Sequence, residues 1–173
     1  MDLRSLTEAD AEAFQRLRLE GLRDAPEAFA ADFEVSAALS LDQFAATLRA
    51  VDGNVVIGAF AGRDLVGIGG FYCNREIKLR HKGTIWGVYI TPAYRGRGVA
   101  RRLIERLVEH AAGDPQIQQI NITVTAVNAR ARQLYVGMGF ETWGLERRAL
   151  LIAGRHYDDE HMVLFLPGRG ERE

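Results

Sequence analysis

Arg95-Gly96-Arg97-Gly98-Val99-Ala100 is the stretch that decides the fold of this chain of 173 residues. It follows an apolar run at residues 85–90 and leads into an amphipathic run at residues 99–111. This order predicts a strand, a tight glycine-rich turn and a helix. Such a turn points free backbone N–H groups and the positive end of a helix dipole at one spot, which favours an anion, most often phosphate.

The segments around this stretch predict a mixed sheet. Residues 119–126 alternate strictly between apolar and polar side chains, which predicts a strand after the helix. A strand, a helix and a strand in this order predict two parallel strands joined by a right-handed crossover. We therefore expect an α/β domain (α+β by stricter usage) whose other strands are mostly antiparallel. These are predicted at residues 54–60 and 65–72, joined as a hairpin, and at residues 140–145 and 162–166.

Caps and apolar spacing predict the remaining elements. Helices are expected over residues 7–21 and 40–49, and a last hairpin over residues 147–162 with its loop at Ala153-Gly154. We expect one domain over residues 1–166 and a frayed tail over residues 167–173.

Composition and charge exclude several classes of protein. The formal net charge is −1, with Lys and Arg scattered among Asp and Glu, so the basic face of a nucleic-acid binder is not expected. Cys73 is the only cysteine, so neither a disulfide nor a Cys-based zinc site can form within one chain. His156 and His161 lack a third ligand, so no metal is expected. No signal-peptide core and no apolar stretch near the ~20 residues of a membrane span is found, so we expect a cytoplasmic protein without membrane contact.

A Gly-x-Gly pair alone is weak evidence for a ligand, because a tight loop before a helix also uses it. A P-loop requires Lys followed by Ser or Thr at the helix start, where this chain has Val99-Ala100. A dinucleotide-binding turn requires a third glycine, where this chain has Arg101. Neither nucleotide-binding pattern fits, and a loop without ligand remains open.

Two motifs together resemble the GNAT superfamily of acyl-CoA-dependent N-acetyltransferases. Arg95-x-x-Gly98-x-Ala100 is similar to the pyrophosphate-binding pattern Gln/Arg-x-x-Gly-x-Gly/Ala of that family. The segment Asn128-Ala129-Arg130-Ala131-Arg132-Gln133-Leu134-Tyr135, closed by Gly139-Phe140, is similar to its second hallmark. The resemblance covers about residues 54–145, and it implies a central pair of splayed parallel strands with flanking helices and acetyl-CoA as cosubstrate.

The resemblance also implies where acetyl-CoA binds. Its pantetheine arm would lie between strands 84–90 and 119–126, and Gly87 is a local clue to the splaying, since glycine within a strand often marks a bulge. Simple packing of Gly87 against a neighbour is the alternative. The cofactor-binding residues implied are Val88, Tyr89, Ile90, Arg95, Gly96, Arg97, Gly98, Val99, Ala100 and Asn128. Arg95 and Arg97 are equally well explained as solvated loop arginines, and Asn128 is also expected to cap a helix.

Tyr135 is the residue that the resemblance implies for catalysis, through a hydrogen bond to the CoA sulfur. The alternative is a core aromatic side chain. Complete proton transfer from an ordinary tyrosine with a pKa near 10 to a thiolate whose thiol has a pKa near 8.5 is uphill by about 2 kcal/mol. Stabilisation of the thiolate by a hydrogen bond and complete protonation therefore both remain open.

The general base is not identified by the sequence. Many family members carry a Glu on the strand before the glycine-rich loop, but residues 85–90 include no carboxylate. Other candidates for the base are Glu34, Glu76, His81, Asp158 and Glu160, each also explained as a surface charge. Candidates for lining an acceptor pocket are Trp86, Tyr72 and Tyr157. The missing strand acid favours an amine of low pKa, such as an amino acid, a peptide N-terminus or an aminated xenobiotic.

The sequence thus predicts an N-acetyltransferase that moves an acetyl group from acetyl-CoA to a primary amine of a small molecule or peptide by direct attack in a ternary complex. A non-catalytic acyl-CoA-binding sensor or interaction module is the alternative, and a nucleotide-phosphate binder is a third. The resemblance also implies a homodimer, since homodimers are common in this family, and the C-terminal strand is a candidate interface.

Overall fold

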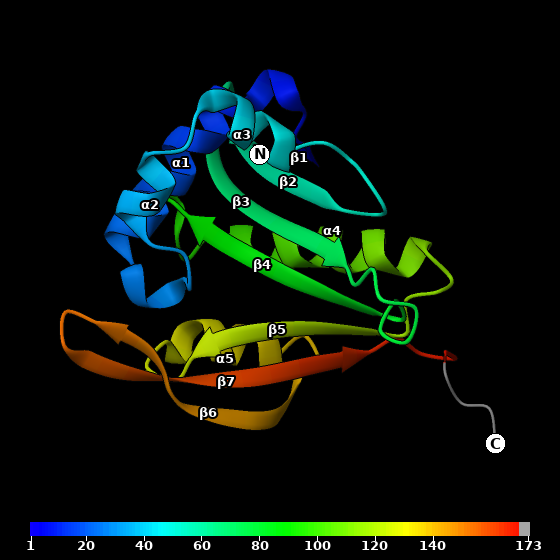
Figure 1. Ribbon diagram of the computed structural model, residues 1–173. Coiled ribbons are helices and arrows are strands. Elements are labelled where there is room, and N and C mark those ends of the chain that lie inside the picture. The colour runs from blue at the N-terminus through cyan, green and yellow to red at the C-terminus, as the bar shows by residue number, and fades with distance from the viewer. Residues whose placement is uncertain (170–173) are drawn as a thin grey trace.

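The computed structural model describes residues 1–169 and has at its centre one seven-stranded sheet in the order β1-β2-β3-β4-β5-β7-β6 (Figure 1). Every neighbouring pair is antiparallel except β4 and β5. The expected mixed, mostly antiparallel sheet is therefore confirmed. The strands are β1 (Asp2–Ser5), β2 (Val55–Ala61), β3 (Asp64–Cys73), β4 (Lys82–Ile90), β5 (Gln119–Thr125), β6 (Glu141–Ile152) and β7 (Arg155–Phe165).

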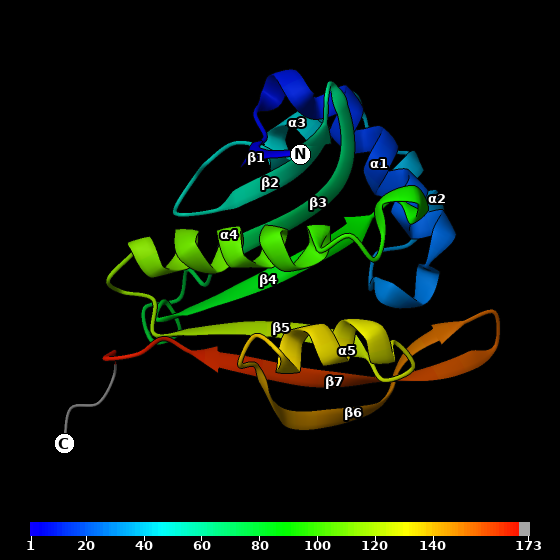
Figure 2. The ribbon, with the colours of Figure 1, turned by 180° about the vertical axis from the view of Figure 1, so that it is seen from behind.

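Helices cover both faces of the sheet and form two separate cores. One face packs against α1 (Ala11–Asp24), α2 (Phe33–Ala37) and α3 (Leu41–Thr47). The other face, seen in Figure 2, packs against α4 (Val99–Gly113) and α5 (Ala129–Val136). Short 3₁₀ turns η1 (Glu8–Asp10), η2 (Pro26–Ala28) and η3 (Pro92–Tyr94) complete the chain.

The helix α4 forms because its apolar residues recur at helical spacing and are buried against the sheet. Leu103, Ile104 and Leu107 are fully buried. Gly69 of β3 makes this close contact possible, since a Cβ there would lie 2.6 Å from Leu103 Cδ2. The helix thus fixes the position of the glycine-rich loop relative to β4.

The parallel strands β4 and β5 pair at one end and separate at the other, as Figure 1 shows. Their pairing covers only Lys82–Thr84 against Gln119–Asn121. Beyond it, Gly87 has a φ of +64°, and the register of β4 against β3 shifts at this point. The bulge bends β4 away from β5, so the predicted splayed pair is confirmed, and Gly87 marks it.

Some predicted boundaries differ from the structure. The strand β1 was not predicted, because Asp2–Ser5 contains one apolar residue and is defined by its pairing with β2. The helix predicted over residues 7–21 begins as η1 and continues as α1 to Asp24. The strands predicted at 140–145 and 162–166 are the outer ends of one long hairpin, β6 and β7, and the predicted loop at Ala153-Gly154 is confirmed.

The C-terminal segment is described only to residue 169. Arg169 donates hydrogen bonds to the carbonyls of Ala112, Asp114 and Ile117, at distances of 2.6–3.0 Å. Residues 170–173, within the predicted tail, lie outside the described residues. Within residues 1–169, the helices are all too short or too polar to cross a membrane.

Candidate active site

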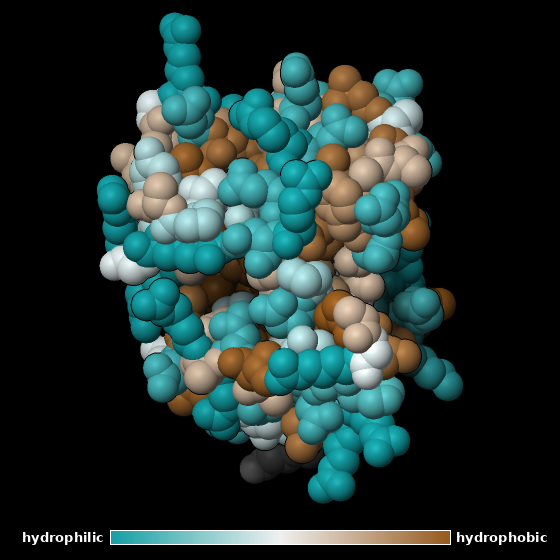
Figure 3. All heavy atoms as spheres, turned by 90° about the vertical axis from the view of Figure 1, so that its left-hand side faces the viewer, coloured by the Kyte–Doolittle hydropathy of each residue, from teal (hydrophilic) through white to brown (hydrophobic). Residues whose placement is uncertain are grey.

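A cleft of about 660 Å³ opens where β4 and β5 separate. Its walls come from both strands, from the N-terminus of α4, from α5 and from η2. Figure 3 looks onto this side of the molecule and shows a hollow with hydrophobic atoms inside and a mostly hydrophilic rim. The fold therefore leaves an opening at the point where two parallel strands end beside a helix N-terminus.

The glycine-rich loop at one end of the cleft is shaped for an anion. Gly96 and Gly98 have φ values of +74° and +76°, a conformation that side chains disfavour. Added Cβ atoms at both positions would meet nothing within 4 Å, so the space beside the loop is open. The first intrahelical bond of α4 runs from Arg102 N to Gly98 O, which leaves the preceding helical N–H groups without helical partners.

The two arginines of the loop play different parts. The Arg95 guanidinium donates from Nε to Ile90 O at 2.9 Å and from Nη2 to the Asp24 carboxylate. This ion pair lowers the pKa of Asp24 and fastens the loop to α1. Arg97 instead lies over the Tyr94 ring, 5.3 Å from its centroid. Of the two, only Arg95 lines the cleft, and its guanidinium is already bound to Ile90 O and Asp24.

The structure brings together all but one of the residues predicted to bind the cofactor. The side chain of Tyr89 is turned toward α1, because its ring packs on Gly21 and its hydroxyl is within hydrogen-bond distance of Glu20 and Asp24. Tyr89 therefore faces the cleft with its main chain. Arg97 is the exception and does not line the cleft. The residues that do line it are Val88, Tyr89, Ile90, Arg95, Gly96, Gly98, Val99, Ala100 and Asn128.

Tyr135 lines the other end of the cleft. Asn128 begins its helix, since Asn128 Oδ1 accepts a hydrogen bond from Ala131 N at 3.1 Å; its expected capping role is confirmed. The Tyr135 ring packs on Phe140, with centroids 6.0 Å apart, and the residue is 6% exposed. Burial alone raises the pKa of Tyr135 well above its ordinary value. Complete loss of its proton therefore costs more than the sequence suggested, which favours a hydrogen-bonding role.

The five side chains considered as general base lie elsewhere. Glu76 and His81 precede β4, at the end where β4 and β5 are still paired. Glu160 accepts hydrogen bonds from Arg132 and Thr142, Asp158 accepts one from Arg148 N, and Glu34 is exposed on α2. Among residues 1–169, none of these five lines the cleft.

Two carboxylates that the sequence analysis did not single out do line it, Asp24 and Glu27. They come from the segment around η2, which reaches across the opening. The Thr125 hydroxyl of β5 donates a hydrogen bond to Glu27 O and ties this segment to the far strand. The sequence pattern does not predict either acid as a cleft residue, because their position beside the cleft depends on how α1 crosses β4.

A second feature that the sequence did not reveal is a row of polar side chains on β5, β7 and β6. Thr123, which lines the cleft, lies with Oγ1 3.2 Å from His161 Nδ1. His161 Nε2 is 2.9 Å from Glu146 Oε2. The Trp143 ring stacks on the imidazole at 5.3 Å. This geometry holds the imidazole in one orientation, with one nitrogen toward a carboxylate and the other toward the cleft.

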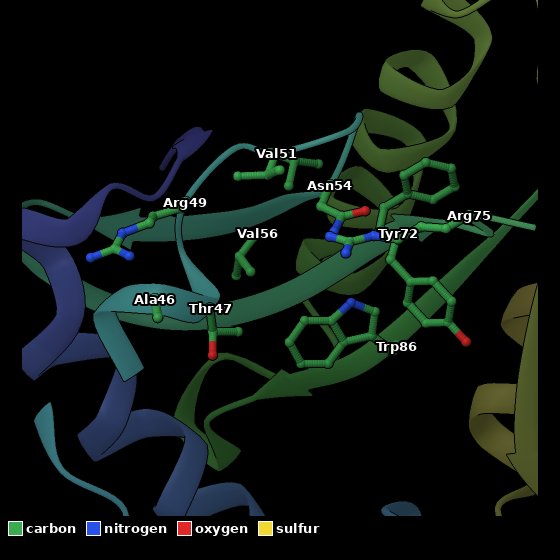
Figure 4. A pocket seen from close by; sticks show the side chains of 11 residues that line it. Ala46, Thr47, Arg49, Val51, Asn54, Val56, Tyr72, Arg75 and Trp86 are labelled. Carbon is green, nitrogen blue, oxygen red and sulfur yellow. The ribbon is translucent and has the colours of Figure 1, made fainter. Parts of the chain in front are cut away.

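Of the three aromatic residues predicted to line an acceptor pocket, only Trp86 lines the cleft. Trp86 lines both the cleft and a second cavity of about 430 Å³, and Tyr72 lines the second cavity. Figure 4 shows Trp86 in this second cavity between Thr47 and Tyr72. The indole lies over Gly70 of β3, where a Cβ would come within 2.2 Å of the ring. Tyr157 lines neither space and instead packs under Arg155.

Comparison with known proteins decides the family. The sequence profile of the Acetyltransferase (GNAT) family matches residues 11–140. The chain belongs to the GNAT acetyltransferase family. Its glycine-rich loop and Tyr135 both lie within the matched residues.

Curated relatives match part of the chain. It is 32% identical over 102 residues to the N-alpha-acetyltransferase RimI of Mycobacterium tuberculosis, an alignment that covers 58% of this chain and 61% of that enzyme. It is 29% identical over 89 residues to the spermidine N(1)-acetyltransferase of Vibrio cholerae, covering 51% of each. The chain therefore matches about half to three fifths of the length of these relatives.

Solved structures share the whole fold. The Salmonella typhimurium yncA structure, a putative acetyltransferase with acetyl-CoA, superposes with a TM-score of 0.85 at 22% identity over 100% of this chain and 98% of that one. A phosphinothricin acetyltransferase from Sinorhizobium meliloti, in complex with acetyl-CoA, gives 0.86 at 19% identity over 99% and 91%. At these identities the likeness establishes the fold.

Proposed function

We propose that this protein is an N-acetyltransferase that moves an acetyl group from acetyl-CoA to a primary amine. The observation that carries the proposal is the cleft itself, which runs from a helix N-terminus shaped for an anion to a buried tyrosine between two splayed strands. Two structures of this fold are described as complexes with acetyl-CoA, and the curated relatives are named as an N-alpha-acetyltransferase and a spermidine N(1)-acetyltransferase.

Each end of the cleft has its part in binding acetyl-CoA. The N–H groups of residues 96–101 receive the pyrophosphate, because they lie in a loop with positive φ at Gly96 and Gly98, beside the positive end of α4. The main chain of Val88 and Ile90, beyond the bulge, pairs with the pantetheine arm in place of β5. Asn128 contacts the same arm while it caps α5.

The reaction proceeds by direct attack of the amine on the thioester in a ternary complex. Cys73 does not carry the acetyl group, since it pairs with Gly83 at the closed end of the β4–β5 pair and burial raises its pKa. Tyr135 donates a hydrogen bond to the sulfur as the C–S bond breaks and negative charge grows there. A phenol with a raised pKa keeps its proton and stabilises the thiolate without transferring it.

His161 is the group that we propose to accept the amine proton, through the Thr123 hydroxyl. Imidazole commonly serves as a general base, and the carboxylate of Glu146 on the neighbouring strand holds its Nε2 at 2.9 Å. Asp159, on the same strand as His161, is a further carboxylate near the imidazole.

We also propose a cytoplasmic homodimer. The C-terminal strand β7 lies between β5 and β6, so the edge at this end of the sheet that is open to a second copy is β6 and not β7. The strand β6 has no further neighbour among the described residues. Apolar side chains stand exposed on β6 and β7: Trp143, Leu145, Leu151 and Phe165. Light scattering on the purified protein tests this, since a monomer at micromolar concentration contradicts it.

The activity is tested by incubating the protein with acetyl-CoA and a panel of primary amines while free CoA thiol is measured. We expect CoA release that depends on the amine, and mass spectrometry should detect an acetylated product. Tight acetyl-CoA binding without turnover on any amine supports a non-catalytic acyl-CoA-binding module instead. Competition by ATP as strong as that by CoA supports a nucleotide-phosphate binder.

A further inference from the structure

The side chain of Arg18 lies next to the bulge of β4, on the face opposite to α4. It comes from α1, and its Nη1 is 3.2 Å from the place where a Cβ on Gly87 would stand. Its guanidinium carbon lies 4.7 Å from the centroid of the Phe29 ring and 5.7 Å from that of Trp86. Phe29, Trp86 and Gly87 all line the cleft. Arg18 therefore lies directly behind this part of the cleft wall and does not itself line the cleft.

Arg18 has no anionic partner within the described part of the chain. Its Nη1 is buried and forms no hydrogen bond with residues 1–169. The nearby acids of α1 are engaged elsewhere, since Asp24 pairs with Arg95, and Glu20 faces the Tyr89 hydroxyl. Burial alone lowers the pKa of Arg18 to about 10, so the side chain is still charged at neutral pH.

An unpaired cation in such a place has a free-energy cost that a purely structural role does not explain. Buried polar groups almost always have hydrogen-bond partners, and a buried charge needs a counter-charge. The two aromatic faces provide some stabilisation through cation–π contacts, which leave the buried Nη1 without a hydrogen-bond partner among residues 1–169. The edge of an arginine matches a carboxylate, because two parallel N–H groups can bind both oxygens.

We propose that Arg18 binds the carboxylate of the acceptor, so that the acceptor is an α-amino acid. This inference rests on the proposed acetyl transfer and names its substrate class. The amine must reach the thioester beside Gly87, and Arg18 lies next to the same residue, so amine and carboxylate have to be close together, as they are on one α-carbon. Gly87 keeps the approach open, since any larger residue would direct its side chain toward Nη1. Polyamines and peptide N-termini lack this carboxylate.

The experiment compares α-amino acids with the corresponding decarboxylated amines, for the wild type and for Arg18→Met. Arg16→Met is the matched control, because Arg16 is exposed on the same helix. A lost hydrogen bond to a charged group predicts that Arg18→Met lowers kcat/KM for amino acids about tenfold or more. The decarboxylated amines and the KM for acetyl-CoA should change less than about twofold, as should all values in the control. Because the comparison is between variants, the different pKa values of the two amines cancel.

A binding measurement keeps the inference testable apart from turnover. Trp86 and Trp143 are the two tryptophans of the chain, so Trp143→Phe leaves Trp86, beside Arg18, as the single fluorescent indole. With CoA present, amino acids should change this fluorescence, and Arg18→Met should weaken the response while Arg18→Lys retains part of it. Circular dichroism confirms that each variant is folded.

Equal amino-acid affinity in the wild type and in Arg18→Met would overturn the role of Arg18. The same conclusion follows if the wild type acetylates the decarboxylated amines as well as the amino acids and Arg18→Met changes neither. Absence of acetyl transfer to every amine overturns the proposed function instead, and the fluorescence titration still decides whether Arg18 binds a carboxylate.

Discussion

Replacing Tyr135 by Phe removes one hydroxyl group and tests its role in the departure of the thiolate. The ring keeps its packing against Phe140, and the phenol makes no hydrogen bond that contributes to its pKa, so the fold should be unaffected. A hydrogen bond to a charged group contributes about 1.5–3 kcal/mol. If this interaction forms only as charge develops on sulfur, kcat should fall roughly 10- to 150-fold. The KM for acetyl-CoA should change less than about twofold, because ground-state binding does not use the hydroxyl.

The assay measures initial rates of CoA release at saturating amine for the wild type and for Tyr135→Phe. Tyr157→Phe is the control, because Tyr157 lies outside the cleft. Since burial raises the pKa of Tyr135, its protonation should not limit the rate at any pH up to about 10, the value for an ordinary tyrosine. An unchanged kcat in Tyr135→Phe refutes the reasoning, and a rise in KM alone would assign the hydroxyl to substrate binding.

Three further predictions concern the loop, the proton acceptor and the fold. Gly98→Ala forces alanine into a φ of +76°, which costs roughly 1–2 kcal/mol. Calorimetry should therefore show that acetyl-CoA binds about tenfold more weakly to this variant. Unchanged affinity would mean that the loop does not need this geometry. His161→Gln should lower kcat/KM near pH 7 about 100-fold, whereas a loss equal to that of His156→Gln would exclude the role. Arg4 lowers the pKa of Asp10 to about 2, below its unfolded value near 3.9, so the stability from this pair is present above pH ~4 and lost as the pH falls toward 2. Melting temperatures between pH 2 and 6 should fall less in Asp10→Asn than in the wild type, and an equal fall in both would contradict the role of this pair.

The sequence predicts those parts of the site that depend on the backbone conformation of glycine. The bulge at Gly87 and the loop at Gly96 and Gly98 all have positive φ, which glycine adopts without cost. The helix after the loop follows from apolar spacing alone. The most predictable part of the candidate site is therefore the part that would bind through main-chain N–H groups.

The remaining part of the site depends on tertiary packing that no local pattern encodes. Asp24 meets Arg95 although the two are 71 residues apart, because α1 crosses the end of β4. Arg18 reaches the bulge for the same reason. The row from Thr123 to His161 exists because β5 and β7 pair in one register. Conversely, Glu76 and His81 are near β4 in the sequence but at its wrong end in space.

Backbone amide hydrogen exchange with and without acetyl-CoA tests most directly whether the cleft between β4 and β5 is the cosubstrate site. We expect slower exchange at residues 96–101, whose N–H groups would hold the pyrophosphate, and at residues 87–90 beyond the bulge. ATP at the same concentration should protect neither segment to the same extent. Protection confined to other segments, or none at saturating acetyl-CoA, would show that acetyl-CoA does not bind in this cleft.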